Sequence, residues 1–334
     1  MNSICTWIYL DSPEETSEYP QVGKGSHQSD FQKVYWRCVA VFFALSKHYN
    51  PTSRHILFSN KKAAEFPVVD GLNIQQFLQE QEVDIVTIPL TWQTPEGYFG
   101  KWRNQFYIFD ILQFIERQEV SDESAFVVLD SDCVIHASLE QLFREIRKNA
   151  LMVLPMPYDE DFNINGITRK GMQEVYAALD GHFPATPPLY YGGEVFAATL
   201  PTIRQINAIA PGVWQHMLER HRNGQIKFNE EAHFLSYCYH KMGRFGLLDP
   251  FIKRIWTSPK YNNVSPEDDR LPIWHLPSEK TGGIALLFRF LANNDRRWMD
   301  ADLGKYLGVP KRKKYLDFKH FLKHTWVYKR LTSF

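Results

Sequence analysis

The stretch AFVVLDSDC (residues 125–133) joins five consecutive apolar residues to two aspartates, Asp130 and Asp132. The run 125–129 is short, unbroken and apolar, which predicts a strand buried on both faces. One aspartate is enough to end such a strand in a turn. Two carboxylates at the carboxyl end of a strand, where open α/β sheets bind their ligands, indicate a cation site. A polar strand-to-turn junction is the simpler alternative, because Asp-x-Asp also occurs by chance.

The rest of the chain alternates between short apolar runs and helical patterns. Four more buried strands are predicted: Ile4–Leu10, His55–Ser59, Asp84–Ile88 and Leu151–Leu154. Residues 31–49 and 102–115 carry apolar side chains at helical spacing, and Ser138 with Gln141 forms a capping-box pattern at the start of another helix. This alternation predicts the fold class, α/β with a mostly parallel central sheet flanked by helices.

The composition is that of a soluble globular protein, with 44% hydrophobic and 23% charged residues among 334. No stretch approaches the roughly 18 uninterrupted apolar residues of a membrane-spanning helix, and the opening MNSICTWIYL lacks a basic leader. We therefore expect a cytoplasmic protein. The four cysteines are far apart and form no Cys-x-x-Cys pair, so we expect reduced, packed thiols rather than a disulfide framework or a zinc site.

The hard oxygen ligands of Asp130 and Asp132 suit Mg²⁺ or Mn²⁺, which bind through one or two carboxylates together with substrate phosphates. In this setting the sequence resembles glycosyltransferases of the GT-A fold, whose Asp-x-Asp motif follows a central strand and holds a divalent cation against the diphosphate of a nucleotide-sugar. The segment LYYGGEVFAAT (189–199) is similar to the sugar-pocket segment of the retaining galactosyl and N-acetylgalactosaminyl transferases of the blood-group type. That likeness implies sugar contacts from Tyr191, Gly192 and Gly193.

The segment KFNEEAHFLSYCYHK (227–241) resembles the downstream Asp-Glu-x-His helix of the same transferases. The match gives Glu231 the position of the catalytic carboxylate and His233 that of the neighbouring substrate-binding histidine. Glu230, also expected at the substrate, stands where that family has aspartate. Acidic residues in a first helical turn also complement the helix dipole, with Asn229 as N-cap, so a purely structural role is the alternative.

Glu194 is the competing candidate for the catalytic carboxylate. Gly192 and Gly193 precede it and would let a ligand approach the backbone closely, and Glu194 would otherwise bind sugar hydroxyls. Position along the chain suggests which residues bind the nucleotide and its phosphates. These are Tyr9 and Asp11, after the first strand, and Lys101 and Arg103, in the segment GKWRNQFYIFDIL.

The segment PIWHLPSEKTGG (272–283) resembles a late element of GT-A enzymes such as the bacterial lipooligosaccharide galactosyltransferases and glycogenin. The resemblance implies that His275 is the third metal ligand and that Lys280 contacts the diphosphate. The spacing between them is one residue shorter than the family pattern. A packed, hydrogen-bonded histidine beside Trp274 is the alternative reading of His275.

These features predict a metal-dependent glycosyltransferase of the hexosyl type. It would take Mn²⁺ or Mg²⁺, use a nucleoside-diphosphate sugar as donor and a glycan or lipid-linked hydroxyl as acceptor, with retention favoured over inversion. A sugar nucleotidyltransferase is the first alternative, since QVGKGSH (21–27) faintly resembles a Gly-rich phosphate loop. A non-catalytic carbohydrate-binding protein on a decayed transferase fold is the second.

We expect a catalytic domain over residues 1–285, with a nucleotide-binding half (1–132) and an acceptor and sugar half (133–285), and a basic aromatic extension over residues 286–334. The last thirty residues carry nine Lys and Arg against one Asp. Their aromatic side chains recur at helical spacing beside a basic face, which indicates a helix on an anionic membrane surface at the inner face of the cell membrane. Docking on the catalytic domain is the alternative, and no motif suggests nucleic-acid binding.

Overall fold

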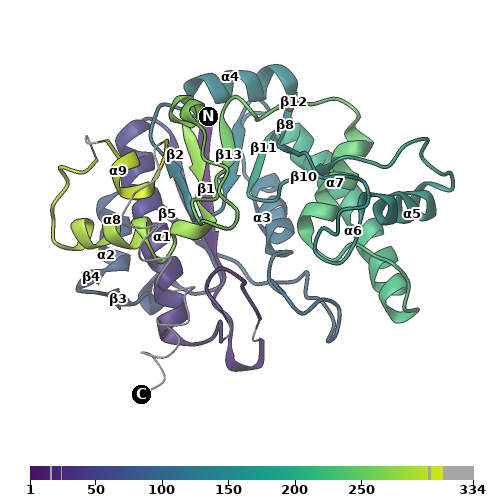
Figure 1. Cartoon of the computed structure of the whole chain (residues 1–334), viewed down its shortest axis with the longest axis horizontal. Helices are drawn as coiled ribbons and strands as arrows, with labels where there is room; N and C mark the ends of the chain where they lie inside the picture. The colour runs from purple at the N-terminus through teal and green to yellow at the C-terminus, as the bar shows by residue number, and fades with distance from the viewer. Residues whose placement is uncertain (16, 24, 300–301, 311–334) are drawn as a thin grey trace.

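The computed structural model describes residues 1–15, 17–23, 25–299 and 302–310. Seven strands form the central sheet: β1 (Asn2–Ile8), β2 (Arg54–Ser59), β5 (Asp84–Thr87), β6 (Ala125–Leu129), β8 (Leu151–Val153), β11 (Val195–Thr199) and β12 (Gly246–Leu247). Their order across the sheet is β12-β8-β11-β6-β1-β2-β5 (Figure 1). The five predicted strands are all present, and β6 has the predicted bounds.

The central sheet is mostly parallel. Strands β5, β2, β1 and β6 run in parallel, with Cys5 of β1 opposite Ile56 on one side and Val128 on the other. Strand β11 lies between β6 and β8 and is antiparallel to both. The unbroken apolar sequence of β6 follows from this position, because every residue of the strand is buried.

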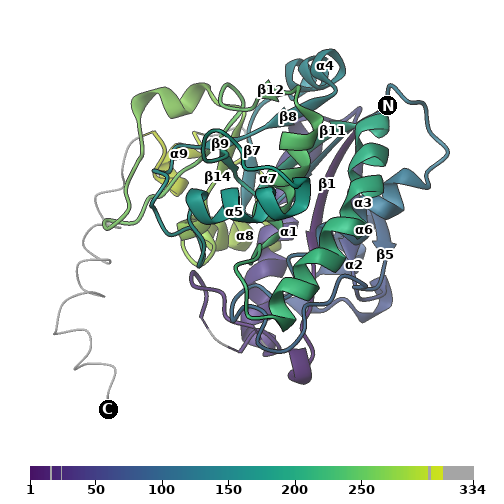
Figure 2. The ribbon, with the colours of Figure 1, turned by 90° about the vertical axis from the view of Figure 1, so that its right-hand side faces the viewer.

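Helices cover both faces of the sheet (Figures 1 and 2). They are α1 (Ser29–Tyr49), α2 (Ile74–Glu80), α3 (Tyr107–Glu116), α4 (Glu140–Asn149), α5 (Arg169–Asp180), α6 (Leu200–Arg222), α7 (Glu231–Met242), α8 (Gly283–Ala292) and α9 (Gly304–Leu307). Val127 and Leu129 of β6 pack in a core with α1, α4 and α8, whereas Phe126 and Val128 pack in a second core with α3, α6 and α7. The predicted fold class, α/β with a mostly parallel sheet flanked by helices, is confirmed.

A second, three-stranded sheet lies next to the end of β6. It consists of β13 (Ile252–Arg254), β14 (Ile273–His275) and β7 (Cys133–Ile135), in the order β13-β14-β7. Strand β14 is antiparallel to β7, and this register places His275 opposite Cys133. The C-terminal part of the chain is thereby brought beside the Asp-x-Asp segment.

The remaining elements are short. Strands β3 (Val68–Val69) and β4 (Leu72–Asn73) form a hairpin, and β9 (Pro155–Met156) pairs with β10 (Tyr190–Tyr191). Four 3-10 turns lie at Pro13–Glu15, Ala63–Glu65, Pro266–Arg270 and Pro277–Glu279.

Two helix starts differ from the prediction. Helix α3 begins at Tyr107 rather than near Trp102, because Trp102 adopts a left-handed backbone with φ of 45° that a helix cannot include. The predicted capping box of α4 is also wrong. The N–H of Leu139 donates to Oδ1 of Asn50 at 2.7 Å, and Gln141 instead accepts hydrogen bonds from Arg144. A distant asparagine therefore anchors this helix, and sequence spacing could not show it.

The segment after residue 285 belongs to the fold as far as it is described. The expected domain boundary at 285 falls inside α8, whose Leu287, Phe288 and Leu291 pack in the first core. Leu307 and Val309 are also buried there. The aromatic residues of the expected membrane helix, beyond residue 310, lie outside the described residues. Within the described residues, no helix is both long and apolar enough to cross a membrane.

Candidate active site

A cleft of about 680 Å³ opens at the carboxyl ends of β1 and β6. This volume lies within the range of sites that enclose a small-molecule ligand. Its walls come from segments far apart in the sequence, including residues 7–10, 130–132, 158–165, 230–232 and 275–280. The Asp-x-Asp segment thus lies where α/β sheets bind ligands.

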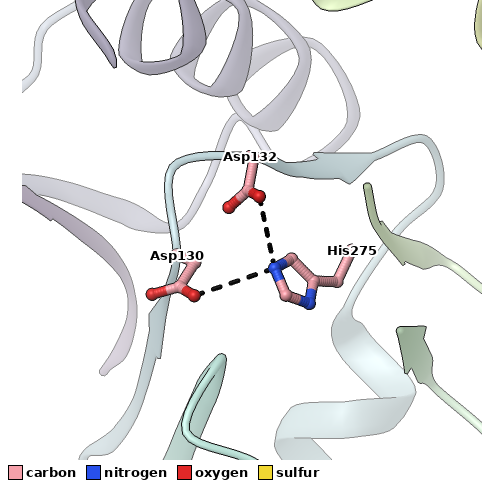
Figure 3. A group of neighbouring side chains, drawn as sticks. All are labelled: Asp130, Asp132 and His275. Atoms are coloured by element: carbon pink, nitrogen blue, oxygen red, sulfur yellow. Dashed lines mark ion pairs between the residues drawn. The ribbon is translucent and has the colours of Figure 1, made fainter. Parts of the chain in front are cut away.

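Asp130, Asp132 and His275 meet in this cleft (Figure 3). Nε2 of His275 lies 3.3 Å from Oδ2 of Asp132 and 3.7 Å from Oδ2 of Asp130. One potential ligand atom from each residue lies within 4.8 Å of the others. The two aspartates follow β6 directly, and the β14–β7 register delivers the histidine. Two carboxylates and one imidazole at this separation fit a single divalent cation.

The charges of the triad are strongly coupled. Burial alone would raise the pKa of Asp132, but Lys280 and His275 outweigh it and hold the pKa well below its usual range. Burial and the negative charge of Asp132 raise the pKa of Asp130 to about 6. Burial disfavours the His275 cation, yet attraction to Asp132 and Glu194 raises its pKa to about 9. The imidazolium and the lysine therefore provide the positive charge that the carboxylates require.

Lys280 lies directly against the triad. Its Nζ is 2.5 Å from Oδ2 of Asp132 and 5.8 Å from the centre of the Tyr35 ring. The 3-10 turn Pro277–Glu279 returns the chain to the cleft five residues after His275. Lys280 is therefore placed both to balance Asp132 and to reach an anion bound beside it.

Glu194 lines the cleft and contacts His275 on the side opposite the aspartates. Its Oε1 is 3.4 Å from Nδ1 of His275 and accepts a 2.9 Å hydrogen bond from Nε of Arg254, whose Nη2 donates to the other oxygen. Burial would raise the pKa of this carboxylate, but Arg254 and His275 hold it well below its usual range. Sequence reasoning missed Arg254, because no pattern marks one arginine at the end of a short strand.

Glu231 is the first residue of α7 and lines the cleft. Its Oε2 is buried and has no hydrogen-bond partner among the described residues. Burial and the neighbouring carboxylates of Glu230 and Asp130 raise its pKa well above the usual value. A buried carboxylate oxygen without a protein partner is suited to a hydroxylated ligand.

Gly192 and Gly193 make room for the two candidate carboxylates. A Cβ at Gly192 would overlap Oε2 of Glu194, and a Cβ at Gly193 would overlap Oε1 of Glu231. We predicted that a ligand could approach the backbone of these glycines, but carboxylates of the protein occupy the space beside them. Of the two glycines, only Gly193 is among the residues that line the cleft.

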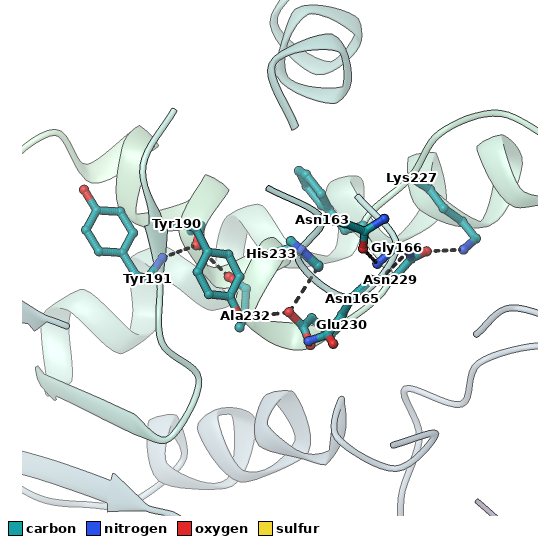
Figure 4. Close-up of polar contacts among 12 residues, drawn as sticks. Asn163, Asn165, Gly166, Tyr190, Tyr191, Lys227, Asn229, Glu230, Ala232 and His233 are labelled. Carbon is teal, nitrogen blue, oxygen red and sulfur yellow. Dashed lines mark hydrogen bonds and ion pairs between the residues drawn. The ribbon is translucent and has the colours of Figure 1, made fainter. Parts of the chain in front are cut away.

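Glu230 is held in a polar cluster beside the cleft (Figure 4). Its Oε1 accepts a 2.8 Å hydrogen bond from Tyr190 Oη, and its Oε2 accepts one of 2.5 Å from Asn165 Nδ2. His233 is fully buried, with Nδ1 3.5 Å from Oε1 of Glu230. It is not among the residues that line the cleft. His233 thus lies close to Glu230, but neither of its ring nitrogens has a hydrogen-bond partner among the described residues.

Tyr190 takes the cleft position that the sequence suggested for Tyr191. The Tyr191 ring packs against Tyr239 and Phe245, and its N–H donates to Ser236 Oγ. Neighbouring residues of a strand point to opposite sides, so only one tyrosine of the pair can face the cleft. The alternation of side chains along a strand could have shown from the sequence that only one of the two tyrosines faces the cleft.

Only some of the expected nucleotide residues line the cleft. Tyr9 and Lys101 line it, whereas Asp11 and Arg103 do not. Asp11 instead accepts hydrogen bonds from Ser26 and from Asn104, and burial raises its pKa to about 6. Sequence reasoning missed other side chains that line the cleft, among them Tyr19, Ser26, Gln32, Trp102, Asn104 and Gln105.

No protein-family model matches the chain, and no curated protein matches its sequence. Solved structures with a similar arrangement include glycosyltransferases. An active-site mutant of LgtC is 12% identical over 89% of this chain and 98% of its own, with a TM-score of 0.49. The galactosyltransferase LgtC in complex with donor and acceptor sugar analogs is 13% identical over 89% and 99%, with a TM-score of 0.47. Mouse xyloside xylosyltransferase 1 is 11% identical over 82% and 97%, with a TM-score of 0.48.

Proposed function

We propose that the protein is a metal-dependent glycosyltransferase that moves a sugar from a nucleoside-diphosphate sugar to a hydroxyl of a glycan or lipid-linked acceptor. The observation that carries this proposal is the triad of Asp130, Asp132 and His275 in one cleft with Glu231, whose Oε2 has no hydrogen-bond partner among the described residues. A cation site beside a carboxylate is the combination that departure of a diphosphate from a sugar carbon requires.

Asp130, Asp132 and His275 would hold the cation. The mixed oxygen and nitrogen donors favour Mn²⁺ over Mg²⁺, which prefers oxygen ligands. When bound, the ion supplies positive charge that neutralises the leaving diphosphate. Lys280, released from Asp132, would add a second positive charge at the same phosphates. Glu194 keeps the Nε2 atom of His275 directed at the aspartates.

Glu231 would face the anomeric carbon of the donor. As an ionised carboxylate it stabilises the positive charge that develops there as the bond to the diphosphate breaks. The charge of Asp130 is one cause of its raised pKa. Neutralising the aspartates would therefore favour the ionised form. The resemblance to retaining transferases favours retention, whereas the same carboxylate acting as general base would give inversion.

The residues that line the cleft suggest how the donor would bind. Tyr9, Trp102 and Asn104 offer aromatic faces and an amide group, which suit a base and ribose. Glu230 and Tyr190, which line the cleft with Glu231, suit the sugar. The triad would then meet the diphosphate.

Product analysis tests this function against its alternatives. The full-length protein is incubated with UDP-, GDP-, ADP- and dTDP-sugars and Mn²⁺, and released nucleotides are separated by chromatography. We expect a nucleoside diphosphate whose release stops when the cation is chelated. Pyrophosphate from a nucleoside triphosphate and a sugar 1-phosphate would instead identify a nucleotidyltransferase. Sugar binding without either product would identify a carbohydrate-binding protein.

We also propose that residues 311–334 attach the enzyme to an anionic membrane surface, where a lipid-linked acceptor would be found. This part of the proposal rests on the sequence alone. Phe318, Phe321, Leu322 and Trp326 recur at three- and four-residue spacing beside Lys319 and Lys323. Since residues 286–310 pack in the fold where they are described, the attachment segment would begin after Pro310.

A further inference from the structure

Exposed aromatic side chains are concentrated at the cleft. Among the described residues, Phe162, Phe183 and Tyr261 are the large aromatic side chains with high exposure, at 52%, 63% and 56%. Two of these three, Phe162 and Tyr261, line the cleft. Apolar surface left open beside polar groups commonly marks a binding site.

Each of the two exposed rings at the cleft, Phe162 and Tyr261, contacts a second aromatic ring. Phe162 stacks on Tyr158 with centroids 4.9 Å apart and an interplanar angle of 10°. Tyr261 lies on Trp256 with centroids 5.8 Å apart. We call these two pairs the aromatic rim. Their contacts provide broad ring faces on two different loops of the same cleft.

Hydrogen bonds hold both loops in place. Arg169 donates to the carbonyl of Tyr158 at 3.0 Å and to the carbonyls of Pro187 and Pro188. In the other loop, Asn263 Oδ1 accepts from the N–H of Trp256 at 2.7 Å, and its Nδ2 donates to the carbonyl of Arg254 at 2.9 Å. The aromatic rim is therefore preorganised, which lowers the entropic cost of binding a ligand there.

The aromatic rim adjoins the residues that surround the triad and Glu231. Nη1 of Arg254 donates to Tyr158 Oη at 3.4 Å, and the same guanidinium holds Glu194 behind His275. The Tyr158 ring also lies 5.8 Å from the ring of Tyr190, the residue that donates to Glu230. The rim thus contacts the residues around the triad and Glu231.

We propose that the aromatic rim is the acceptor subsite and binds a pyranose ring of the acceptor against Phe162 and Tyr261. The proposal rests on the function proposed above, because the donor occupies the remainder of the cleft. One face of a pyranose presents C–H groups that pack on an aromatic ring, while its edge presents hydroxyls. Asn163 and Asn165, close to Phe162 in the sequence, also line the cleft. Oδ1 of Asn163 accepts from the N–H of Gly166 and Nδ2 of Asn165 donates to Glu230, which leaves Nδ2 of Asn163 and Oδ1 of Asn165 to meet those hydroxyls (Figure 4).

A lipid chain is the less suitable occupant. It would cover the amides of Asn163 and Asn165 and the hydroxyl of Tyr261 without offering hydrogen bonds in return, and an unpaired buried polar group is costly. A sugar satisfies both the apolar faces and the polar groups. We therefore assign the rim to a carbohydrate acceptor.

The test measures sugar binding by the full-length protein, independently of turnover. Lactose, maltose, cellobiose and N-acetyllactosamine are titrated by saturation-transfer NMR into the unmodified protein, the double variant Phe162→Ala/Tyr261→Ala and the control Phe183→Ala. We expect at least one disaccharide to bind. Its dissociation constant should rise about tenfold or more in the double variant and stay unchanged in the control, which removes an exposed ring outside the cleft.

Circular dichroism checks that the double variant remains folded. A second double variant, Phe162→Leu/Tyr261→Leu, keeps apolar area but loses the flat ring faces, so it should lose an intermediate amount of sugar affinity. Binding of none of the four sugars, or equal binding to the unmodified protein and the double variant, would overturn the proposal. So would unchanged sugar binding together with lost binding to neutral phosphatidylcholine vesicles, which would identify a lipid occupant. Nucleoside diphosphate release by the unmodified protein without acceptor reports separately on the proposed transferase function.

Discussion

Oε1 of Glu194 lies 3.4 Å from Nδ1 of His275, while Arg254 holds both oxygens of the same carboxylate. This relationship decides which nitrogen of the imidazole is available. Since Nδ1 faces a carboxylate, Nε2 is left to face Asp130 and Asp132. Glu194 would therefore act on the proposed metal site through the histidine, as carboxylates behind ligating histidines commonly do.

Glu194→Gln should weaken Mn²⁺ binding about 10- to 100-fold. The neutral amide no longer balances the positive charge of Arg254 and His275, and it no longer orients the imidazole ring of His275. Turnover should recover substantially at saturating Mn²⁺. The matched control is Asp180→Asn, which removes another carboxylate held by a cation, Lys241, away from the cleft, and should leave Mn²⁺ affinity unchanged. A large loss of kcat with unaltered Mn²⁺ affinity would instead make Glu194 the catalytic carboxylate.

Asp132→Asn and Asp130→Asn should both abolish Mn²⁺-dependent turnover but differ in stability. The Asp132 side chain is 2% exposed and pairs with Lys280 and His275, so its loss leaves buried positive charge uncompensated and should cost about 3 kcal/mol. The Asp130 side chain is 36% exposed and is repelled by Asp132, so its loss should cost little. Urea unfolding without metal measures both values. Equal stability of the two variants would contradict this account.

Glu231→Gln should lower kcat by orders of magnitude with little change in KM for the donor, the pattern of a contact made mainly in the transition state. Gly193→Ala should also lower kcat, because the new Cβ overlaps the place of the Glu231 carboxylate. Steady-state kinetics with the donor identified by product analysis measures both. Normal kcat in Glu231→Gln would exclude this residue as the catalytic carboxylate.

The buried His55 should make part of the stability sensitive to acid. Burial and the charge of Lys47 lower its pKa to about 4. An unfolded histidine binds its proton near pH 6.5, so as the pH falls from 6.5 to 4 the unfolded state gains a proton before the folded state does. The stability advantage of neutral His55 is thereby lost, by about 2 kcal/mol at pH 4.5.

Urea unfolding of the wild type and His55→Gln at pH 7.5 and pH 4.5 tests this sign. The deficit of the variant at pH 7.5 should shrink by about 2 kcal/mol at pH 4.5. Phe43→Leu, which changes a ring packed 6.3 Å from His55 but adds no titratable group, should show the same deficit at both pH values. A deficit of His55→Gln that does not depend on pH would show that His55 does not titrate differently in the two states.

Deletion after Pro310 should lower binding to vesicles that contain phosphatidylserine, while the core that includes Leu307 and Val309 is retained. The basic residues contribute about 1 kcal/mol each near an anionic surface, and salt screens that attraction, so binding of the full chain should weaken as salt rises. Sedimentation with vesicles at low and high salt measures it. Identical sedimentation of both proteins at low salt would mean that residues 311–334 do not attach the enzyme to membranes.

The sequence by itself determined the strands and helices whose patterns involve residues close together in the chain. The apolar run 125–129 forms a strand because it is buried on both faces, and the alternation of such runs with helical patterns predicted the parallel sheet. Asp130 and Asp132 were also found from the sequence, since residues that follow a central strand lie at the ligand-binding edge of the sheet. These predictions depend on neighbours a few residues apart.

Only the tertiary structure decided how distant segments complete the cleft. Antiparallel pairing of β14 with β7 puts His275 beside the aspartates, and Arg254 meets Glu194 across sixty positions of sequence. The strand geometry of β10 turned Tyr190 rather than Tyr191 toward Glu230. The sequence could not show that Arg254 and His275 are the partners of Glu194. A side chain's role depends on the charges and hydrogen-bonding groups around it in space, and long-range strand pairing supplies those neighbours.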